Sequence, residues 1–386
     1  MTERFAFTGA RIFTGEEWLE RAALVVGDGV VEGTMAADSP SDAVRVPLGG
    51  GMLVPGFIDL QVNGGGGVLF NDAPTLDAIR TICATGHRFG TTGLLPTLIT
   101  DTPEVTAGAI EAGAEAARAG VPGFLGLHLE GPHLSLARKG AHDPALIRPM
   151  QEADLERLVA ARALLPNLLT TVAAETVPPE RIAALAQARI VVSIGHSEAS
   201  YAQVISAAAS GASMVTHLFN AQSQLGNREP GVVGAALDSG ALWAGLIADG
   251  IHVHDAAIGV ALRSKRGPGR IFLVTDAMAL TGSAAQSFTL NGREIRRAGG
   301  ALRLADGTLA GADLTMIDAV ARMRRAIGLP LDEALRMAAL YPAQAMGLAA
   351  RHGHLKRGAV ASMVHLTDDL KVRATWVAGR EVYRAD

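Results

Sequence analysis

Between about residues 51 and 348 the chain repeats a short apolar run followed by a longer amphipathic segment rich in Ala and Leu. Strands buried on both faces have continuous apolar runs, and the segments between them have helical periodicity. Eight such runs occur, namely MLVPGFIDLQV, TGLLPTLI, GFLGLHLE, NLLTTVAAE, IVVSIGH, SMVTHL, WAGLIAD and RIFLVTDA. Since eight βα units close a barrel, the pattern predicts an α/β fold, a (β/α)8 barrel of the TIM type. Two further helical segments, ADLTMIDAVARMRRAIG and LDEALRMAALYPAQAMG, are expected to cover the outside of the eighth strand.

Both ends of the chain have a different pattern, with short alternating segments broken by Gly-Asp, Thr-Gly and Ala-Gly turns. Alternation interrupted by such turns indicates β hairpins. Because both β-rich ends flank the barrel, we expect them to form one small β-sandwich together. The predicted limits are 1–54 and 355–386 for the two parts of the sandwich and 55–354 for the barrel.

Polar side chains gather at the C-terminal ends of the predicted strands, which in such barrels form the active-site face. In chain order they are Asp59, Gln61, Asn63, His128, Glu130, Glu175, His196, His217, Asp249, His252, His254 and Asp276. Any one of them alone is as well explained by a buried hydrogen bond or a helix cap. The convergence of the whole set predicts an active site.

Glu130, His196 and His217 form the best candidate metal site within this set. Two neutral imidazoles and one carboxylate give Zn²⁺ three ligands and leave a position for water, which is a hydrolytic rather than a structural ligand count. Such a metal lowers the pKa of a water molecule and polarises an amide carbonyl. Asp276, at the end of the last strand, is the candidate carboxylate for proton transfer, with a capping role as the alternative.

Three more residues are candidates for contact with substrate. Arg228 precedes a glycine-containing turn that can start a helix, which suits phosphate or another anion, although an ion pair with Glu229 explains it equally. His252 adds a second cation or hydrogen-bond donor. His142 lies in a loop long enough to cover the barrel mouth, where it can hydrogen-bond a substrate carbonyl; a turn residue is the alternative.

Composition narrows the kind of partner. A net charge of −4 with scattered Lys and Arg argues against nucleic acid or an anionic membrane as the main ligand and favours a small molecule.

Cys83 is the only cysteine, which excludes an intramolecular disulfide and a thiolate metal cluster. This cysteine usage leads us to expect a reducing cytoplasm, and no charged start leads into an apolar run behind Met1, so no secretory signal is visible. The glycines at 64–67 lack a following Lys-Ser or Lys-Thr, and no GxSxG occurs, which excludes a phosphate loop and a serine nucleophile elbow.

Several motifs together resemble one known family. PGFIDLQVNGGGG, GLHLEGPHLS, KGAHDP, GHSEA, THLFNAQSQLGNREPG, ADGIHVH, LVTDAM and GTLAGADLTM are similar to the N-acetylglucosamine-6-phosphate deacetylases of the amidohydrolase superfamily. The motifs run from residue 55 past residue 316, and LYPAQAMGL and GHLKRGAVASMV extend the resemblance to nearly the whole chain.

The resemblance implies hydrolysis of N-acetyl-D-glucosamine 6-phosphate to D-glucosamine 6-phosphate and acetate, in amino-sugar recycling. It also implies one divalent metal per subunit on Glu130, His196 and His217, with zinc expected first and Fe²⁺, Co²⁺ or Mn²⁺ as alternatives. Asp276 is then the acid/base and His142 orients or polarises the acetamide. The implied sugar-phosphate contacts are Asn220, Ala221, Arg228 and His252. A homodimer is implied, in which the phosphate site borrows a residue from the neighbouring subunit.

Two positions depart from the wider pattern. Most of the superfamily has His-x-His after the first strand and binds two metals, whereas this chain has Gln61 and Asn63. Amides are poor ligands compared with imidazole, so we expect one catalytic metal, with Gln61 and Asn63 at a possible secondary site. His133 stands where a bulky apolar residue is expected, and we assign it no role.

Two alternatives stay open at this point. The chain can be another barrel amidohydrolase that acts on an N-acyl amino acid or a cyclic amide, with Arg228 binding a carboxylate. It can also be a metal-free, non-catalytic homologue, although the retained Glu130, His196, His217 and Asp276 argue against that.

Overall fold

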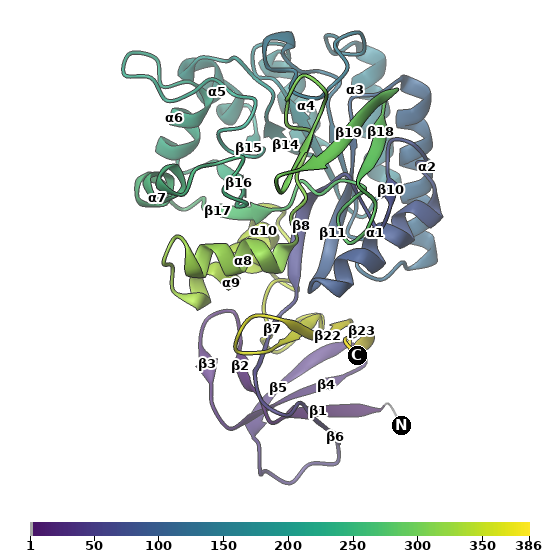
Figure 1. Cartoon of the computed structure of the whole chain (residues 1–386), viewed down its shortest axis with the longest axis vertical. Coiled ribbons are helices and arrows are strands. Elements are labelled where there is room, and N and C mark those ends of the chain that lie inside the picture. The colour runs from purple at the N-terminus through teal and green to yellow at the C-terminus, as the bar shows by residue number, and fades with distance from the viewer. Residues whose placement is uncertain (1–2) are drawn as a thin grey trace.

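The computed structural model describes residues 3–386, with a barrel above and a smaller β domain below (Figure 1). The eight apolar runs supply one eight-stranded sheet with parallel neighbours in chain order, so the prediction of a (β/α)8 barrel is confirmed. The strands are β8 (Phe57–Val62), β11 (Thr91–Ile99), β12 (Leu127–Glu130), β13 (Leu168–Val172), β14 (Val191–Ile194), β15 (Ala212–Val215), β16 (Trp243–Ile247) and β17 (Ile271–Val274).

Between β17 and β8 the barrel is closed by hydrogen bonds beyond the regular strands. The Asp276 N–H donates to the Gln61 carbonyl at 3.0 Å, and the Asn63 N–H donates to the Ala277 carbonyl at 2.8 Å. The buried carboxylate of Asp59 accepts the Thr275 hydroxyl at 2.5 Å and the Thr275 N–H at 3.2 Å. Burial raises the pKa of Asp59 to about 7 despite these bonds. Asp59 therefore joins the first strand to the last.

Helices cover the outside of the barrel. They are α1 (Leu76–Arg88), α2 (Pro103–Ala119), α3 (Glu152–Leu164), α4 (Pro179–Gln187), α5 (Tyr201–Ala209), α6 (Gly231–Asp238), α7 (Asp255–Ser264), α8 (Met316–Arg325), α9 (Leu331–Ala338) and α10 (Leu340–Ala345). Several begin at an oxygen-bearing cap, as α5 does at Ser200, whose side chain accepts the Gln203 N–H. The two segments expected after the eighth strand form α8 and the pair α9 and α10, which contact β17 and β8. None of the described helices combines the length and apolarity that a membrane crossing needs.

A three-stranded antiparallel sheet between β17 and α8 did not follow from our sequence analysis. It consists of β18 (Ser287–Leu290), β19 (Arg293–Ala298) and β20 (Ala301–Arg303). Its buried side chains Leu290, Ile295 and Leu302 pack with Leu69 and Met278 near the carboxyl ends of the barrel strands. The sheet therefore adds a wall to the end of the barrel that bears the candidate site. Two short strands after β8, β9 (Gly64–Gly65) and β10 (Val68–Leu69), lie beside it.

The two ends of the chain form the small β domain. One sheet has the order β5-β4-β1-β6, and the other has the order β23-β22-β21-β7-β2-β3. Their strands are β1 (Arg4–Thr8), β2 (Arg11–Phe13), β3 (Trp18–Leu19), β4 (Ala22–Gly27), β5 (Val30–Ala36), β6 (Val44–Pro47), β7 (Met52–Pro55), β21 (Met363–Leu366), β22 (Val372–Val377) and β23 (Arg380–Arg384). The antiparallel pairing of β21 with β7 joins the two ends, while the exact domain limits stay a prediction.

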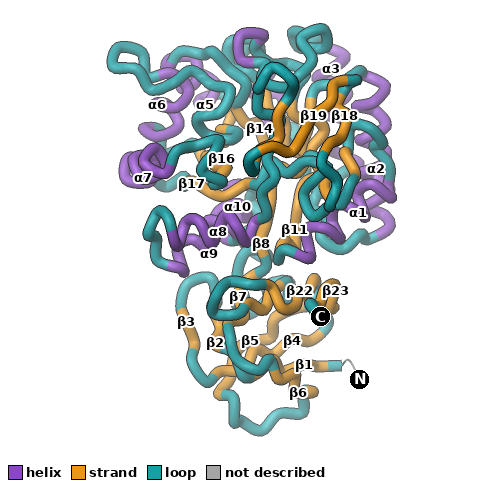
Figure 2. The backbone as a smooth tube through the Cα atoms, viewed as in Figure 1, coloured by secondary structure: helices purple, strands orange, loops and turns teal. Residues whose placement is uncertain are grey.

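The position of the β domain fixes which end of the barrel is open. β7 belongs to the β domain and β8 follows it directly, so the barrel strands run away from that domain (Figure 1). Loops gather at the far end, where Figure 2 shows them as teal segments above the strands. The carboxyl ends of the strands, and with them the candidate site, lie opposite the β domain.

The raised pKa of Asp59 predicts a pH-dependent stability. Between about pH 4 and 7 the folded protein holds a proton on Asp59 that the unfolded chain loses. The contribution of Asp59 to the free energy of unfolding is therefore complete below about pH 4 and declines as the pH rises. Asp59→Asn keeps a neutral acceptor for Thr275 and removes the titration. In urea unfolding with a chelator present, we expect the wild type to lose about 2 kcal/mol relative to Asp59→Asn between pH 5 and pH 7. A constant difference over that range would contradict a protonated Asp59.

Candidate active site

The three predicted metal ligands meet at the carboxyl ends of β12, β14 and β15. The Glu130 Oε1 lies 3.4 Å from the His196 Nε2 and 3.2 Å from the His217 Nε2, and the two ring nitrogens are 3.1 Å apart. Donor atoms bound about 2.0–2.1 Å from a tetrahedral ion lie about 3.3 Å from one another. All three side chains are buried. The triad therefore has the spacing and the chemistry of a small divalent cation site.

A hydrogen bond behind the triad turns the lone pair of one imidazole toward Glu130. The Nδ1–H of His196 donates to the Arg138 carbonyl at 2.8 Å, which leaves its Nε2 lone pair facing Glu130. Burial opposes ionisation of Glu130, but hydrogen bonds and positive charge from His196 and His217, when these imidazoles carry protons in the metal-free site, hold the pKa of its carboxyl well below the usual range. The buried Nδ1 of His217 has no hydrogen-bond partner among the described residues. The Glu130 carboxylate and the His196 Nε2 lone pair thus face each other, an arrangement that a bound cation would stabilise.

Local backbone geometry aims these residues into the barrel. His196 (φ 47°), His217 (φ 28°) and Asp276 (φ 51°) adopt left-handed conformations just beyond the ends of β14, β15 and β17. Such conformations cost about 1–3 kcal/mol for a residue with a side chain and persist only where the surroundings enforce them. The strand ends therefore bend sharply at the residues that carry the chemistry.

His142 approaches the triad from the loop that follows the short helix η1 (Leu136–Arg138). Its Nε2 lies 3.9 Å from the Glu130 Oε2. Its Nδ1 accepts the Thr100 N–H at 3.4 Å and lies 2.8 Å from the Thr100 hydroxyl. Because a backbone N–H can only donate, the ring proton belongs on Nε2, and burial lowers the pKa of the imidazole well below its usual value. His142 is therefore a neutral donor directed at the metal triad, although its distance from Glu130 and His196 also fits a ligand.

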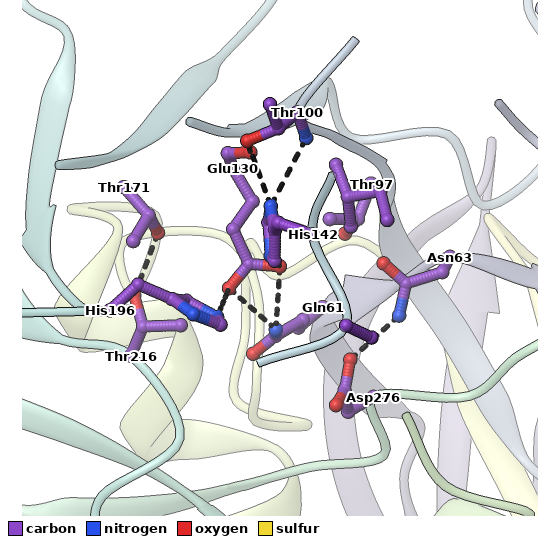
Figure 3. Close-up of polar contacts among 12 residues, drawn as sticks. Gln61, Asn63, Thr97, Thr100, Glu130, His142, Thr171, His196, Thr216 and Asp276 are labelled. Carbon is purple, nitrogen blue, oxygen red and sulfur yellow. Dashed lines mark hydrogen bonds and ion pairs between the residues drawn. The ribbon is translucent and has the colours of Figure 1, made fainter. Parts of the chain in front are cut away.

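Gln61 and Asn63 each hold one carboxylate of the site (Figure 3). The Gln61 amide N–H₂ donates to both oxygens of Glu130, at 3.2 and 3.3 Å. The Asn63 amide donates to the Asp276 Oδ1 at 2.6 Å. Burial, followed by the negative charge of Glu130, raises the pKa of Asp276 to about 6. The two amides at the end of β8 thus position acidic groups in the described structure.

A cavity of about 340 Å³ opens onto these groups, a size typical of small-molecule sites. The predicted residues that line it are Asn63, Glu130, His142, His196, His217, Asn220, Ala221, His252 and Asp276. Gln61 lies behind Glu130 and does not line the cavity. Arg228 is exposed on the loop before α6, outside the cavity, and makes no ion pair with Glu229 within residues 3–386. The structure therefore brings together all the predicted site residues except Arg228.

Part of the cavity wall comes from residues that the sequence analysis did not assign. Leu290 of β18 and residues 308–311 form one side, and Arg138 of η1 forms another. Arg138 is the only Arg or Lys among the described lining residues, and its guanidinium pairs with Glu198. The motif GTLAGADLTM contains residues 308–311, so the sequence did hold a signal for this wall.

The remaining strand-end residues support loops around the site. Glu175 accepts the Ser197 hydroxyl at 2.6 Å and the Glu198 N–H at 2.7 Å, which fixes the loop after His196. Asp249 accepts the Nδ1–H of His252 at 2.6 Å. His254 caps the start of α7.

His133, which had no predicted role, is buried behind the cavity. Its Nδ1 lies 3.1 Å from the Arg148 carbonyl, and its Nε2 is 4.0 Å from the Asp154 carboxylate. Burial lowers the pKa of His133 to about 4. A neutral His133 therefore fastens the loop between β12 and α3 and does not line the cavity.

Comparison with known proteins places this geometry in a family. Residues 52–382 match the Amidohydrolase family. An N-acetylgalactosamine-6-phosphate deacetylase of Shewanella sp. (strain ANA-3) is 42% identical over 98% of this chain and 96% of its own length. An N-acetylglucosamine-6-phosphate deacetylase of Haemophilus influenzae is 34% identical over 98% of this chain and 99% of its own. The crystal structure of N-acetylglucosamine-6-phosphate deacetylase from Pasteurella multocida has a TM-score of 0.94 at 36% identity, covering 98% of this chain and 99% of that one. With the resemblance of the motifs thus confirmed over most of its length, this chain belongs to the amidohydrolase family.

Proposed function

We propose that the protein hydrolyses the acetamide of an N-acetylated hexosamine 6-phosphate, with N-acetyl-D-glucosamine 6-phosphate giving D-glucosamine 6-phosphate and acetate. The observation that carries the proposal is the convergence of the metal triad, His142 and Asp276 on one cavity. Relatives with this activity in their names, at 34% identity and above, support the substrate class. N-acetyl-D-galactosamine 6-phosphate is a second candidate, because the Shewanella relative that acts on it is 42% identical.

The proposed metal centre holds one divalent ion per subunit, with zinc as the first expectation. Glu130, His196 and His217 would bind it, because their donor atoms already have the spacing of a tetrahedral site. When bound, such an ion lowers the pKa of a water molecule and polarises the acetamide carbonyl. The amide side chain of Gln61 would keep Glu130 in place through its two hydrogen bonds.

The proton transfers fall to Asp276 in this proposal. Its carboxylate takes a proton from the attacking water as the new C–O bond forms, and returns it to the nitrogen as the C–N bond breaks. A pKa raised to about 6 suits a group that must both accept and donate near neutral pH. Asn63 holds one carboxylate oxygen and leaves the other for the transfers. The His142 Nε2–H would donate to the acetamide oxygen.

Phosphate recognition would be shared between subunits. His252 offers its Nε2 to the cavity because Asp249 occupies its Nδ1, and Asn220 and Ala221 line the same wall. Arg228 lies outside its own cavity on an exposed loop that also carries the exposed side chain of Leu225. We propose that in a homodimer Arg228 reaches the phosphate bound by the neighbouring subunit. The protein would act in the cytoplasm on amino sugars, with no nucleic-acid or membrane partner.

Asp276→Asn is expected to keep the metal and to lower kcat by about 10²- to 10⁴-fold, since it removes the group that transfers the proton. His196→Ala should instead lower the metal content. Both variants are measured for kcat and for metal by elemental analysis. An Asp276→Asn enzyme near the wild-type rate would refute its role. Wild-type protein with less than about half an equivalent of metal, and no activity restored by Zn²⁺, Co²⁺ or Fe²⁺, would favour a non-catalytic homologue.

Substrate preference separates this proposal from other amide hydrolases. We expect kcat/KM for N-acetyl-D-glucosamine 6-phosphate to exceed that for unphosphorylated N-acetylglucosamine by at least about 10²-fold, because the phosphate contacts are lost with the bare sugar. The galactosamine 6-phosphate epimer, assayed in parallel, decides which sugar is preferred. Equal rates on both phosphorylated and bare sugars, or faster hydrolysis of an N-acyl amino acid or cyclic amide, would reject the proposal.

A mixed-subunit experiment tests the origin of Arg228. Arg228→Ala and Asp276→Asn proteins are each expected to be impaired, but hybrid dimers contain one site with an intact Asp276 and a neighbour's intact Arg228. Co-expression with two different tags and sequential purification should therefore recover about half of the wild-type rate at saturating substrate. The control is a dimer in which both subunits carry Arg228→Ala and each subunit carries a different tag. Hybrids no more active than the parents would show that Arg228 acts within its own subunit or not at all.

A further inference from the structure

A continuous chain of buried polar side chains crosses the barrel beneath the metal triad. The Ser193 hydroxyl lies 2.6 Å from that of Thr216, which lies 2.7 Å from that of Thr171. The His128 Nε2 is 2.7 Å from the Thr171 hydroxyl, and its Nδ1 is 3.2 Å from the hydroxyl of Thr97. All five residues are at most 6% exposed. Figure 3 shows Thr171 and Thr216 joined beside His196.

The direction of these hydrogen bonds can be assigned from their ends. The Thr97 hydroxyl can donate to the Leu95 carbonyl at 3.2 Å, and it accepts the Val62 N–H at 2.9 Å. If the chain of donors starts at Ser193 and ends at the Leu95 carbonyl, every hydroxyl hydrogen has an acceptor. In the opposite direction the Ser193 hydrogen has none among the described residues. His128 is then neutral, with its proton on Nδ1 and a lone pair on Nε2.

This chain links the strands that carry the metal ligands. His128 lies on β12, two residues before Glu130. Ser193 lies on β14, three residues before His196, and Thr216 directly precedes His217. Thr171 of β13, which carries no ligand, stands between them and also accepts the Gly131 N–H through its carbonyl at 3.1 Å.

We propose that His128 is a positioning residue of the metal centre. Its ring and the linked hydroxyls hold the ends of β12, β14 and β15 at the separation that brings the three ligand atoms within 3.4 Å of one another. The inference rests on the metal centre proposed above. A chain of this kind specifies one arrangement because losing any member leaves a buried partner unsatisfied, at a cost of about 1–3 kcal/mol.

Thr171→Val tests the chain without touching a ligand. Valine has nearly the same shape, but it leaves His128 and Thr216 without their shared partner. We expect the zinc dissociation constant, measured by chelator competition, to rise about 10- to 100-fold, the scale seen when groups that orient metal ligands are removed. The absorption spectrum of the Co²⁺-substituted protein should change as well, since it reports ligand geometry. Ser193→Ala removes the hydroxyl at the end of the chain and should raise the zinc dissociation constant about threefold, with a change in the Co²⁺ spectrum as well. This variant replaces Thr171→Val in the test if Thr171→Val does not fold.

Thr170→Val is the matched control. Thr170 is on the same strand and as fully buried as Thr171, but its hydroxyl donates only to the Leu129 carbonyl, outside the chain. It should cost stability in the metal-free protein while leaving zinc affinity and the Co²⁺ spectrum within about twofold of wild type. If Thr171→Val matched Thr170→Val in both metal readouts, the chain would be a stabilising core element and the inference would be overturned. Wild-type protein that binds no divalent metal would instead overturn the metal centre, and this inference with it.

Discussion

Three electron-rich atoms held within 3.4 Å of one another in a buried pocket are the constraint on which the site depends. The Arg138 carbonyl fixes the His196 ring so that a lone pair, and not a proton, faces Glu130. Without a cation, such a cluster must take up a proton or move apart, because imidazole lone pairs that face a buried carboxylate repel its negative charge. A divalent ion turns that repulsion into binding energy. The arrangement is therefore costly alone and favourable only with a metal.

The rigid strands of the barrel must hold the ligands in this unfavourable arrangement. Left-handed backbone at His196, His217 and Asp276 is tolerated only because the neighbouring strands are rigid. At the point of closure, where β17 and β8 lack regular pairing, Asp59 accepts two hydrogen bonds from Thr275, and two backbone bonds just beyond the strand ends add to them. The hydroxyl chain through His128 would add a second constraint below the ligands. The β18 to β20 sheet then contributes Leu290 to one side of the cavity.

Sequence reasoning worked where one physical pattern dominates. Continuous apolar runs can be buried only as parallel strands or buried helices, so the eight strands and their order were predictable, as was the convergence of strand-end residues. The three-stranded sheet was missed although FTLNGREIRRAGGALRL alternates around Asn-Gly and Gly-Gly turns, because our reading placed helices directly after the eighth strand. The partners of His128 were not predictable, since a threonine in a strand gives no sign of whether it faces the barrel interior or the helices. Arg228 marks another limit, because the contact between subunits that we propose for it would leave no trace in one chain's own cavity.

The departure at Gln61 and Asn63 can now be understood in terms of donors and acceptors. A histidine ligand offers a lone pair to a metal, whereas a primary amide offers two N–H donors on its nitrogen and only a weakly basic oxygen. In this chain both amides use the nitrogen, Gln61 toward Glu130 and Asn63 toward Asp276. Each carboxylate gains a neutral donor that holds it in place without adding positive charge. A second cation at that position would lower the pKa of Asp276 and weaken it as a base. The amides therefore suit the proposed centre with one metal, in which Asp276 would stay basic enough to take a proton and acidic enough to return it.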